Sequence, residues 1–123
     1  MNSYIFAGLY PKTKAKFLED LENPPIKKIG PDRMVSIICQ HFEISKEDLL
    51  RRTRKREILV PRQWLSFMLR NHSTLSSFTH IGNFMEFNHS TIISACTNVK
   101  NGILYYNEYK NHYHKLIKRI QDD

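Results

Sequence analysis

The sequence predicts an all-α fold, a small helical domain that contains a helix-turn-helix. Apolar residues recur at the three- and four-residue spacing that places them on one face of a helix. Proline, serine and asparagine stand at positions where such helices would begin. A chain of 123 residues is long enough for one small domain with a modest hydrophobic core.

The chain is strongly basic, with a formal net charge of +7 and an isoelectric point of about 9.5. This charge favours a polyanionic partner, with nucleic acid ahead of a membrane surface. No apolar run approaches the roughly 20 residues of a membrane span, and residues 1–10 lack the charged region of a secretion signal. Cys39 and Cys96 fall among apolar helical positions, where reduced thiols are favoured over a disulfide. We therefore expect a cytoplasmic protein.

Residues 1–30 differ from the rest and form a predicted N-terminal arm and linker. An aromatic and aliphatic patch occupies residues 4–10, and a short helix is expected over residues 13–22 before Pro24 ends it. Residues 27–30 have the composition of a linker. The arm is interpreted either as a loosely packed segment or as a docking segment for a protein partner.

The helix-turn-helix domain is expected to span residues 31–123. Its first helix begins at Pro31, because proline suits the first helical position, and ends near Glu43. A second, short helix begins after Ser45, whose hydroxyl can cap it, with Asp48 in its third position.

Five basic residues occupy six consecutive positions from Arg51 to Arg56. A helix from Pro61 to about Asn71 follows, with Pro61 in its first turn. Its wide apolar face comprises Trp64, Leu65, Phe67, Met68 and Leu69. The basic run is thus held between two packed helices, and a solvated surface is the plain alternative to a nucleic-acid contact.

A short helix from Ser76 to about Met85, a turn at Glu86-Phe87 and a longer helix from Asn88 have the layout of a helix-turn-helix. The longer helix has an apolar stripe formed by Ile92, Cys96, Val99 and Ile103. Its opposite side is neutral and short-chained, and comprises Ser90, Ser94, Thr97 and Asn101. Such a face can approach base edges in a major groove. The alternative is a plain amphipathic helix that Asn88 caps.

A last helix is expected from about Asn107 to Ile120, after a weakening of the preceding helix at Asn101-Gly102. Its apolar stripe consists of Tyr106, Tyr109, Tyr113, Leu116, Ile117 and Ile120. We expect these tyrosines to pack in or beside the core rather than to stack on bases.

Motifs of catalysis and cofactor binding are missing from the sequence. It contains no G-x-x-x-x-G-K-[ST], no G-x-G-x-x-G and no H-E-x-x-H. Its six histidines do not have the spacing of a zinc site, and no carboxylate cluster of the kind that binds nuclease metals is visible. These observations favour a binding module that is not an enzyme and that uses neither a metal nor a cofactor.

The order of several short motifs resembles the C-terminal DNA-binding domain of DnaA, the bacterial replication initiator. The motifs are Asp48-Leu49-Leu50 before the basic run, Pro61-Arg62-Gln63, Ile81-Gly82, Asn88-His89-Ser90-Thr91 and Ala95-Cys96. The resemblance covers roughly residues 31–120. The family's ATPase core has no counterpart in this sequence, so the resemblance implies a relative of the DNA-binding domain without the motor.

The resemblance implies DNA contacts for five residues that precede the longer helix from Asn88. Arg54 aligns with the basic-loop arginine that the family inserts into the minor groove, and Arg56 belongs to the same loop. Arg62 and Gln63 match contacts to the DNA backbone. Arg70 falls near a basic residue that lies close to the DNA.

The implied major-groove readers are Asn88, His89, Ser90 and Thr91, with His89 placed against a thymine methyl. The family reads D-H-T-T at these positions and has Gly-Gly-Arg before them, where residues 85–87 here are Met-Glu-Phe. Asparagine both donates and accepts, so Asn88 can pair with adenine through two hydrogen bonds unless its side chain serves as a helix cap. The recognised sequence therefore need not be the family's usual DnaA box.

We interpret the chain as a sequence-specific double-stranded DNA-binding protein that regulates transcription or replication. Two alternatives stay open at this point. The same basic surface could bind RNA, which a preference for single strands with tyrosine stacking would indicate. The domain could also be an adaptor that recruits a protein through residues 1–30, which salt-insensitive protein binding without DNA affinity would indicate.

Overall fold

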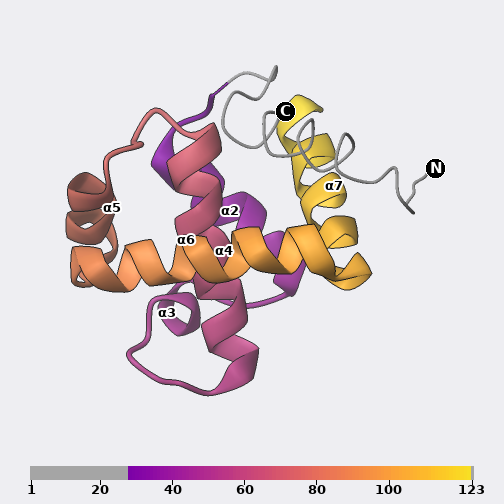
Figure 1. Cartoon of the computed structure of the whole chain (residues 1–123). Helices are drawn as coiled ribbons and strands as arrows, with labels where there is room; N and C mark the ends of the chain where they lie inside the picture. The colour runs from indigo at the N-terminus through magenta and orange to yellow at the C-terminus, as the bar shows by residue number, and fades with distance from the viewer. Residues whose placement is uncertain (1–27, 123) are drawn as a thin grey trace.

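The structure is a computed structural model that describes residues 28–122. The helices in these residues are α2 (Pro31–Phe42), α3 (Lys46–Leu49), α4 (Arg56–His72), α5 (Phe78–Met85), α6 (His89–Tyr105) and α7 (Asn107–Gln121) (Figure 1). The predicted all-α fold is therefore confirmed for this part of the chain, in which no helix is long and apolar enough to cross a membrane. The patch predicted at residues 4–10, the helix predicted at 13–22 and the docking role of the arm lie outside the described residues.

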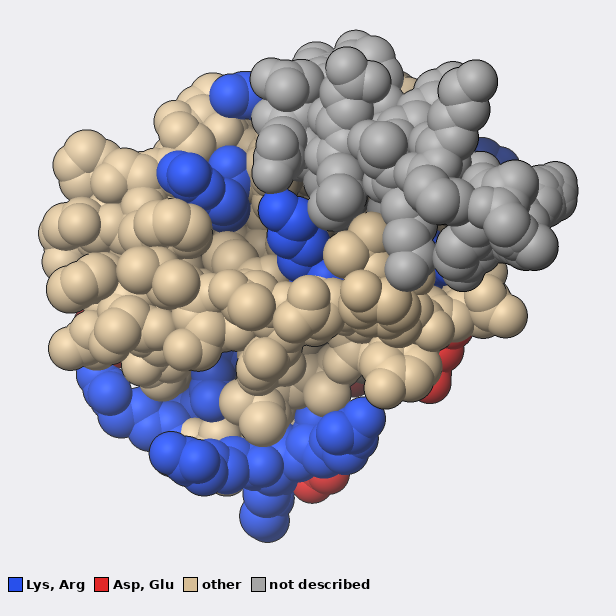
Figure 2. Space-filling model, viewed as in Figure 1, with Lys and Arg blue, Asp and Glu red and all other residues tan. Residues whose placement is uncertain are grey.

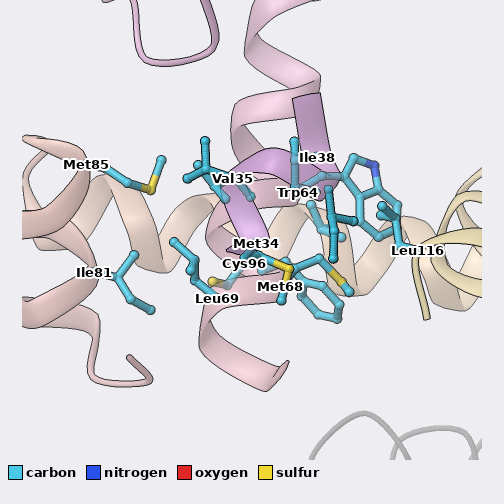
Figure 3. Close-up of a cluster of buried hydrophobic side chains, with 14 of the residues drawn as sticks. Met34, Val35, Ile38, Trp64, Met68, Leu69, Ile81, Met85, Cys96 and Leu116 are labelled. Atoms are coloured by element: carbon cyan, nitrogen blue, oxygen red, sulfur yellow. The ribbon is translucent and has the colours of Figure 1, made fainter. Parts of the chain in front are cut away.

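Helix α4 lies at the centre of the domain, and α6 crosses it (Figure 1). Helix α6 has its most extensive contact with α4, α5 packs against α6, and α2 packs against both α4 and α7. The core between them is fully closed to solvent at Met34, Trp64, Met68, Ile81 and Leu116 (Figure 3). Because these residues come from α2, α4, α5 and α7, the core fixes the place of the helix-turn-helix in the domain.

The first two helices begin as the capping pattern predicts. Pro31 is the first residue of α2, which Glu43 ends in a left-handed conformation by donating its N–H to the carbonyl of Cys39. The hydroxyl of Ser45 accepts a hydrogen bond from the N–H of Asp48 at 3.1 Å and thereby caps α3. At the other end of α3, the N–H of Leu50 donates to the carbonyls of Lys46 and Asp48, and the basic run follows directly.

Helix α4 begins earlier than predicted, at Arg56, and Pro61 lies inside it. Its first turn is already formed, because the N–H groups of Ile58 and Leu59 donate to the carbonyl of Lys55 at 3.0 and 2.7 Å. Proline has no N–H for the carbonyl four residues earlier, so the helix loses one hydrogen bond near its start and continues. The predicted first-turn position of Pro61 was wrong, and the basic run passes directly into α4.

Helix α6 continues through Gly102, so the predicted weakening there does not end it. A Cβ atom at Gly102 would lie 2.4 Å from the ring of Tyr109, and glycine therefore lets α7 pack closely against α6. Tyr113 is buried as expected, whereas Tyr106 is 64% exposed and stands between the two helices. The predicted place of Tyr106 on the apolar stripe was therefore wrong.

The first described residues pack against the end of α4. Ile29 is 9% exposed, its N–H donates to the carbonyl of His72 at 3.1 Å, and its carbonyl accepts from the N–H of Thr74 at 2.9 Å. These bonds flank an isolated parallel β-bridge between Ile29 and Ser73. Part of the predicted linker thus belongs to the packed structure, and the domain boundary at residue 30 stays a prediction.

Both cysteines are free thiols, as predicted. Cys96 is buried, and Cys39 is half-buried. Burial raises the pKa of Cys96 to about 12 and raises that of Cys39 as well. Because the thiolate is the nucleophilic form, neither cysteine is poised for chemistry.

We expect the fold to lose stability in acid, because two histidines are held neutral inside it. His72 is fully buried with its Nε2 atom 3.0 Å from the Tyr113 hydroxyl, and burial, assisted by the charge of Lys28, lowers its pKa from 6.5 to about 4. Burial, and then the neighbouring His112, lowers the pKa of His41 to about 4. The unfolded chain takes up these protons at a higher pH than the folded chain does.

Stability from these groups is therefore complete above about pH 6.5 and falls as the pH drops to about 4. For fully buried His72 the loss amounts to about 3 kcal/mol. Urea unfolding across this range measures the free energy of unfolding at each pH. His72→Gln cannot take up the proton, so its unfolding free energy should fall less steeply with decreasing pH. A wild-type stability that stays constant through the same range contradicts the expectation.

Candidate nucleic-acid interface

The backbone of two residues shapes the turn between α5 and α6. Glu86 ends α5 in a left-handed conformation with φ of 61°, which costs more for glutamate than for glycine. The N–H groups of Glu86 and Phe87 both donate to the carbonyl of Gly82. A Cβ atom at Gly82 would lie 2.7 Å from the carbonyl oxygen of Phe87. The predicted Ile81-Gly82 motif therefore marks a position where the turn leaves no space for a side chain.

Asn88 caps the start of α6. Its Oδ1 atom accepts hydrogen bonds from the N–H of Ser90 at 2.9 Å and from the hydroxyl of Ser90 at 2.7 Å. Pairing with adenine through two hydrogen bonds requires this same oxygen as an acceptor. The capping alternative is therefore the arrangement found in the structure, and the Nδ2 donor is the part of the amide that the cap does not use.

The first turn of α6 presents a neutral polar surface. His89, Ser90 and Thr91 are exposed, and the first turn carries no acidic residue. Ser94 and Asn98 extend the exposed polar surface along the helix. In Figure 2 the band that α6 forms across the molecule is mostly free of charged side chains. This surface has donors and acceptors for base edges and has no charge that would repel phosphate.

The basic loop, residues 51–55 between α3 and α4, lies beside this surface. Figure 2 shows Lys and Arg side chains gathered along the lower edge of the molecule, where Figure 1 places the loop. Arg54 and Arg56 are exposed. Arg51 forms an ion pair with Asp48, and Arg52 donates to the carbonyl of Glu86. The loop therefore has both solvent-facing cations and cations that bind the protein itself.

Arg62 lies beneath the basic loop and is only 8% exposed. Its guanidinium donates to the carbonyls of Arg51 at 2.5 Å and Thr53 at 3.0 Å. Burial, and then the charge of Arg52, lowers its pKa, although an arginine stays charged in a protein. These bonds hold the loop on α4, and the backbone contact implied for Arg62 stays a prediction. Gln63, the next residue, is half-buried.

A groove of about 850 Å³ separates the basic loop from α6. Among the residues that line it are Arg54, Gln63, Ser90, Thr91 and Asn98. One wall is therefore cationic and the other is neutral and polar. The structure brings together five of the predicted site residues at this groove, namely Arg54, Arg62, Gln63, Ser90 and Thr91. His89 and Arg56 are exposed but are not among the residues that line it.

Arg70 lies apart from the groove. Its guanidinium donates to the carbonyl of Ser76 at 2.7 Å and covers the ring of Phe78 with its Cζ atom 4.2 Å from the ring centroid. It lines a second, smaller depression together with Phe78 and Lys100. The structure therefore places Arg70 at the connection of α4 and α5, and its contact with DNA stays a prediction.

Three residues of the groove were not identified in the sequence. Arg52 was one of several similar arginines, and nothing local marked it as the one that reaches Glu86. Phe87 was assigned to the turn, but its ring contacts two guanidinium groups. Asn98 lies seven residues after Thr91, and this helical spacing is the signal that could have placed it on the same face.

The chain matches a family model described as "Bacterial dnaA protein helix-turn-helix" over residues 31–99, which is more than half of its length. A "Chromosomal replication initiator protein DnaA" from Oleidesulfovibrio alaskensis is 39% identical over 69 residues, and one from Lachnoclostridium phytofermentans is 32% identical over 105 residues. A third, from Synechocystis sp., is 32% identical over 80 residues.

These alignments cover 56%, 84% and 63% of this chain in the same order. They cover only 15%, 23% and 18% of the respective relatives, so the chain spans a small part of their length. The matched residues include α5, the turn and most of α6. The chain therefore belongs to the family of DnaA C-terminal helix-turn-helix DNA-binding domains.

Proposed function

We propose that this chain binds double-stranded DNA sequence-specifically and regulates replication or transcription. The observation that carries the proposal is the groove between the cationic loop and the neutral start of α6. A phosphate strand lying in this groove would have the loop at the minor groove on one side and α6 in the major groove on the other. The phosphates would then be attracted by the cationic loop and would not be repelled by the neutral start of α6.

The two walls of the groove would contribute differently to binding. Arg54 and Arg56, both exposed, supply affinity for the DNA backbone, which is independent of sequence. His89, Ser90 and Thr91 read base edges, with the imidazole of His89 against a thymine methyl. Gln63, half-buried in the groove, lies where a backbone oxygen would pass. The Nδ2 group of Asn88 adds a donor beside them.

The regulatory role is supported by the relatives, which carry the name of a chromosomal replication initiator. Selection of bound molecules from a random duplex library at a stated salt concentration tests the proposal directly. A defined duplex motif with an affinity that falls steeply with salt is expected. Selection of single-stranded RNA in preference to every duplex, or the absence of any motif, would overturn it.

Arg54→Ala should weaken binding most on sites that have an A·T-rich flank. A narrow A·T-rich minor groove has an enhanced negative potential that favours an inserted guanidinium. The loss of one such charged contact corresponds to roughly ten-fold in Kd. Fluorescence anisotropy on duplexes that differ only in this flank measures the effect.

Arg51→Ala is the matched control, because Arg51 is a loop arginine already paired with Asp48. It should weaken both duplexes slightly and equally. An Arg54→Ala penalty that is the same with an A·T and a G·C flank would show that Arg54 is a general phosphate contact.

A further inference from the structure

We propose that Phe87 is a positioning residue that fixes the basic loop relative to the start of α6, and that it thereby determines how selectively the domain binds its site. The inference rests on the proposed function for its DNA readout. It concerns this chain's own turn, in which a phenylalanine precedes the capping residue Asn88.

The ring of Phe87 is held between two guanidinium groups from different parts of the domain. The Cζ atom of Arg52, in the basic loop, lies 4.9 Å from the ring centroid. The Cζ atom of Arg62, in α4, lies 4.7 Å from it. A guanidinium at this distance is attracted by the electrons of an aromatic ring. One side chain of the turn therefore contacts both the loop and the helix beneath it.

Carbonyl groups complete the environment of the two cations. Arg62 donates to the carbonyls of Arg51 and Thr53, on either side of Arg52 in the chain. Arg52 in turn donates to the carbonyl of Glu86, next to Phe87. Two like charges this close repel each other, and three carbonyl oxygens together with the ring offset that repulsion. These contacts consequently link the basic loop, α4 and the turn to one another.

The turn connects Phe87 to the start of α6. The N–H of Phe87 donates to the carbonyl of Gly82 at 2.9 Å, which fixes the residue to α5. The next residue, Asn88, is the cap of α6. The distance between Arg54 on one wall of the groove and Thr91 on the other is thus set through Phe87. Loss of the ring removes no positive charge, but it lets the two walls of the groove move relative to each other.

The experiment compares Phe87→Leu, which keeps apolar bulk without an aromatic face, with Phe87→Tyr, which keeps the face. The Kd values for the selected duplex and for a scrambled duplex are measured at several salt concentrations. For Phe87→Leu we expect the Kd of the selected duplex to rise about ten-fold, while the scrambled duplex changes by less than about two-fold. The log–log salt slope should not change, because no cation is removed. Phe87→Tyr should bind like wild type.

Phe78→Leu is the matched control, because Phe78 is also covered by an arginine, Arg70, but lines the second depression and not the groove. It should leave the ratio of selected to scrambled affinity unchanged. Arg62→Lys is the second variant, since lysine keeps the charge but cannot donate to two carbonyls in a fork. It should reproduce the loss of selectivity at an unchanged salt slope.

Hydrogen exchange of the loop amides in the DNA-free protein gives a readout that does not depend on the proposed function. The N–H of Lys55 donates to the hydroxyl of Thr53, so exchange at this amide reports on the loop. Exchange should accelerate in Phe87→Leu and Arg62→Lys but not in Phe78→Leu. If wild type selects no duplex, the proposed function fails, but the hydrogen-exchange measurement still tests the contact of Phe87 with Arg52 and Arg62. Unchanged exchange, or equal losses on the selected and the scrambled duplex, would overturn the role of Phe87.

Discussion

Gly82→Ala is expected to lower the stability of the domain and to weaken specific DNA binding by more than about ten-fold. The new Cβ atom would lie 2.7 Å from the carbonyl oxygen of Phe87 and 3.4 Å from the backbone nitrogen of His89. Both obstacles are backbone atoms, so the turn itself must move. Alanine normally stabilises a helix by about 1 kcal/mol relative to glycine, and here the overpacking of about 1–3 kcal/mol outweighs that gain.

Thermal unfolding and anisotropy with the selected duplex measure the two consequences of this change. Gly30→Ala is the matched control, because a Cβ atom at Gly30 has nothing within 4 Å. It should change neither the melting temperature nor the affinity appreciably. A Gly82→Ala protein that is as stable as wild type and binds as tightly would show that the turn can shift without consequence for α6.

Trp64→Ala should produce the largest loss of stability, about 3–5 kcal/mol. Trp64 is completely buried on α4, where its ring stacks on Tyr109 at 5.6 Å between centroids and meets Phe67 edge-on at 5.9 Å. Removing it leaves a cavity between α4 and α7. A loss of this size is a large fraction of the 5–15 kcal/mol that typically separates folded and unfolded states.

Urea unfolding at neutral pH measures this loss. Trp64→Phe is the control, because it keeps an aromatic ring. The indole N–H of Trp64 has no hydrogen-bond partner among the described residues, so this change removes no hydrogen bond there. It should cost clearly less than Trp64→Ala. Equal losses for the two variants would mean that the indole does not pack as described.

Local signals predicted the helices whose ends are decided by local chemistry. Pro31, Ser45 and Asn88 stand at the starts of α2, α3 and α6 as expected, because a cap acts on neighbours within one turn. Pro61 misled the prediction of α4, since its preference for a first turn competes with the packing of Ile58, which is buried one turn earlier. The burial of one face of α4 therefore outweighs the positional preference of a single proline.

The candidate site was predictable in outline and less so in its contacts. The exposed polar start of α6 and the basic run were both read from spacing and charge. The burial of Arg62 could not be read in this way, because the carbonyls of Arg51 and Thr53 come over it only when the loop folds back on α4. The link from Arg52 to Glu86 spans 34 residues and depends equally on the tertiary fold.

The attachment of the basic loop to Arg62 has a thermodynamic consequence for recognition. A loop that becomes ordered only on DNA loses conformational entropy at that moment, and the observed affinity is reduced accordingly. Here the two carbonyls that flank Arg52 are already bound by a buried guanidinium in the free protein. The entropy of that part of the loop is lost during folding of the domain. Binding should therefore show the small heat-capacity change of a preformed surface and not the large one of coupled folding.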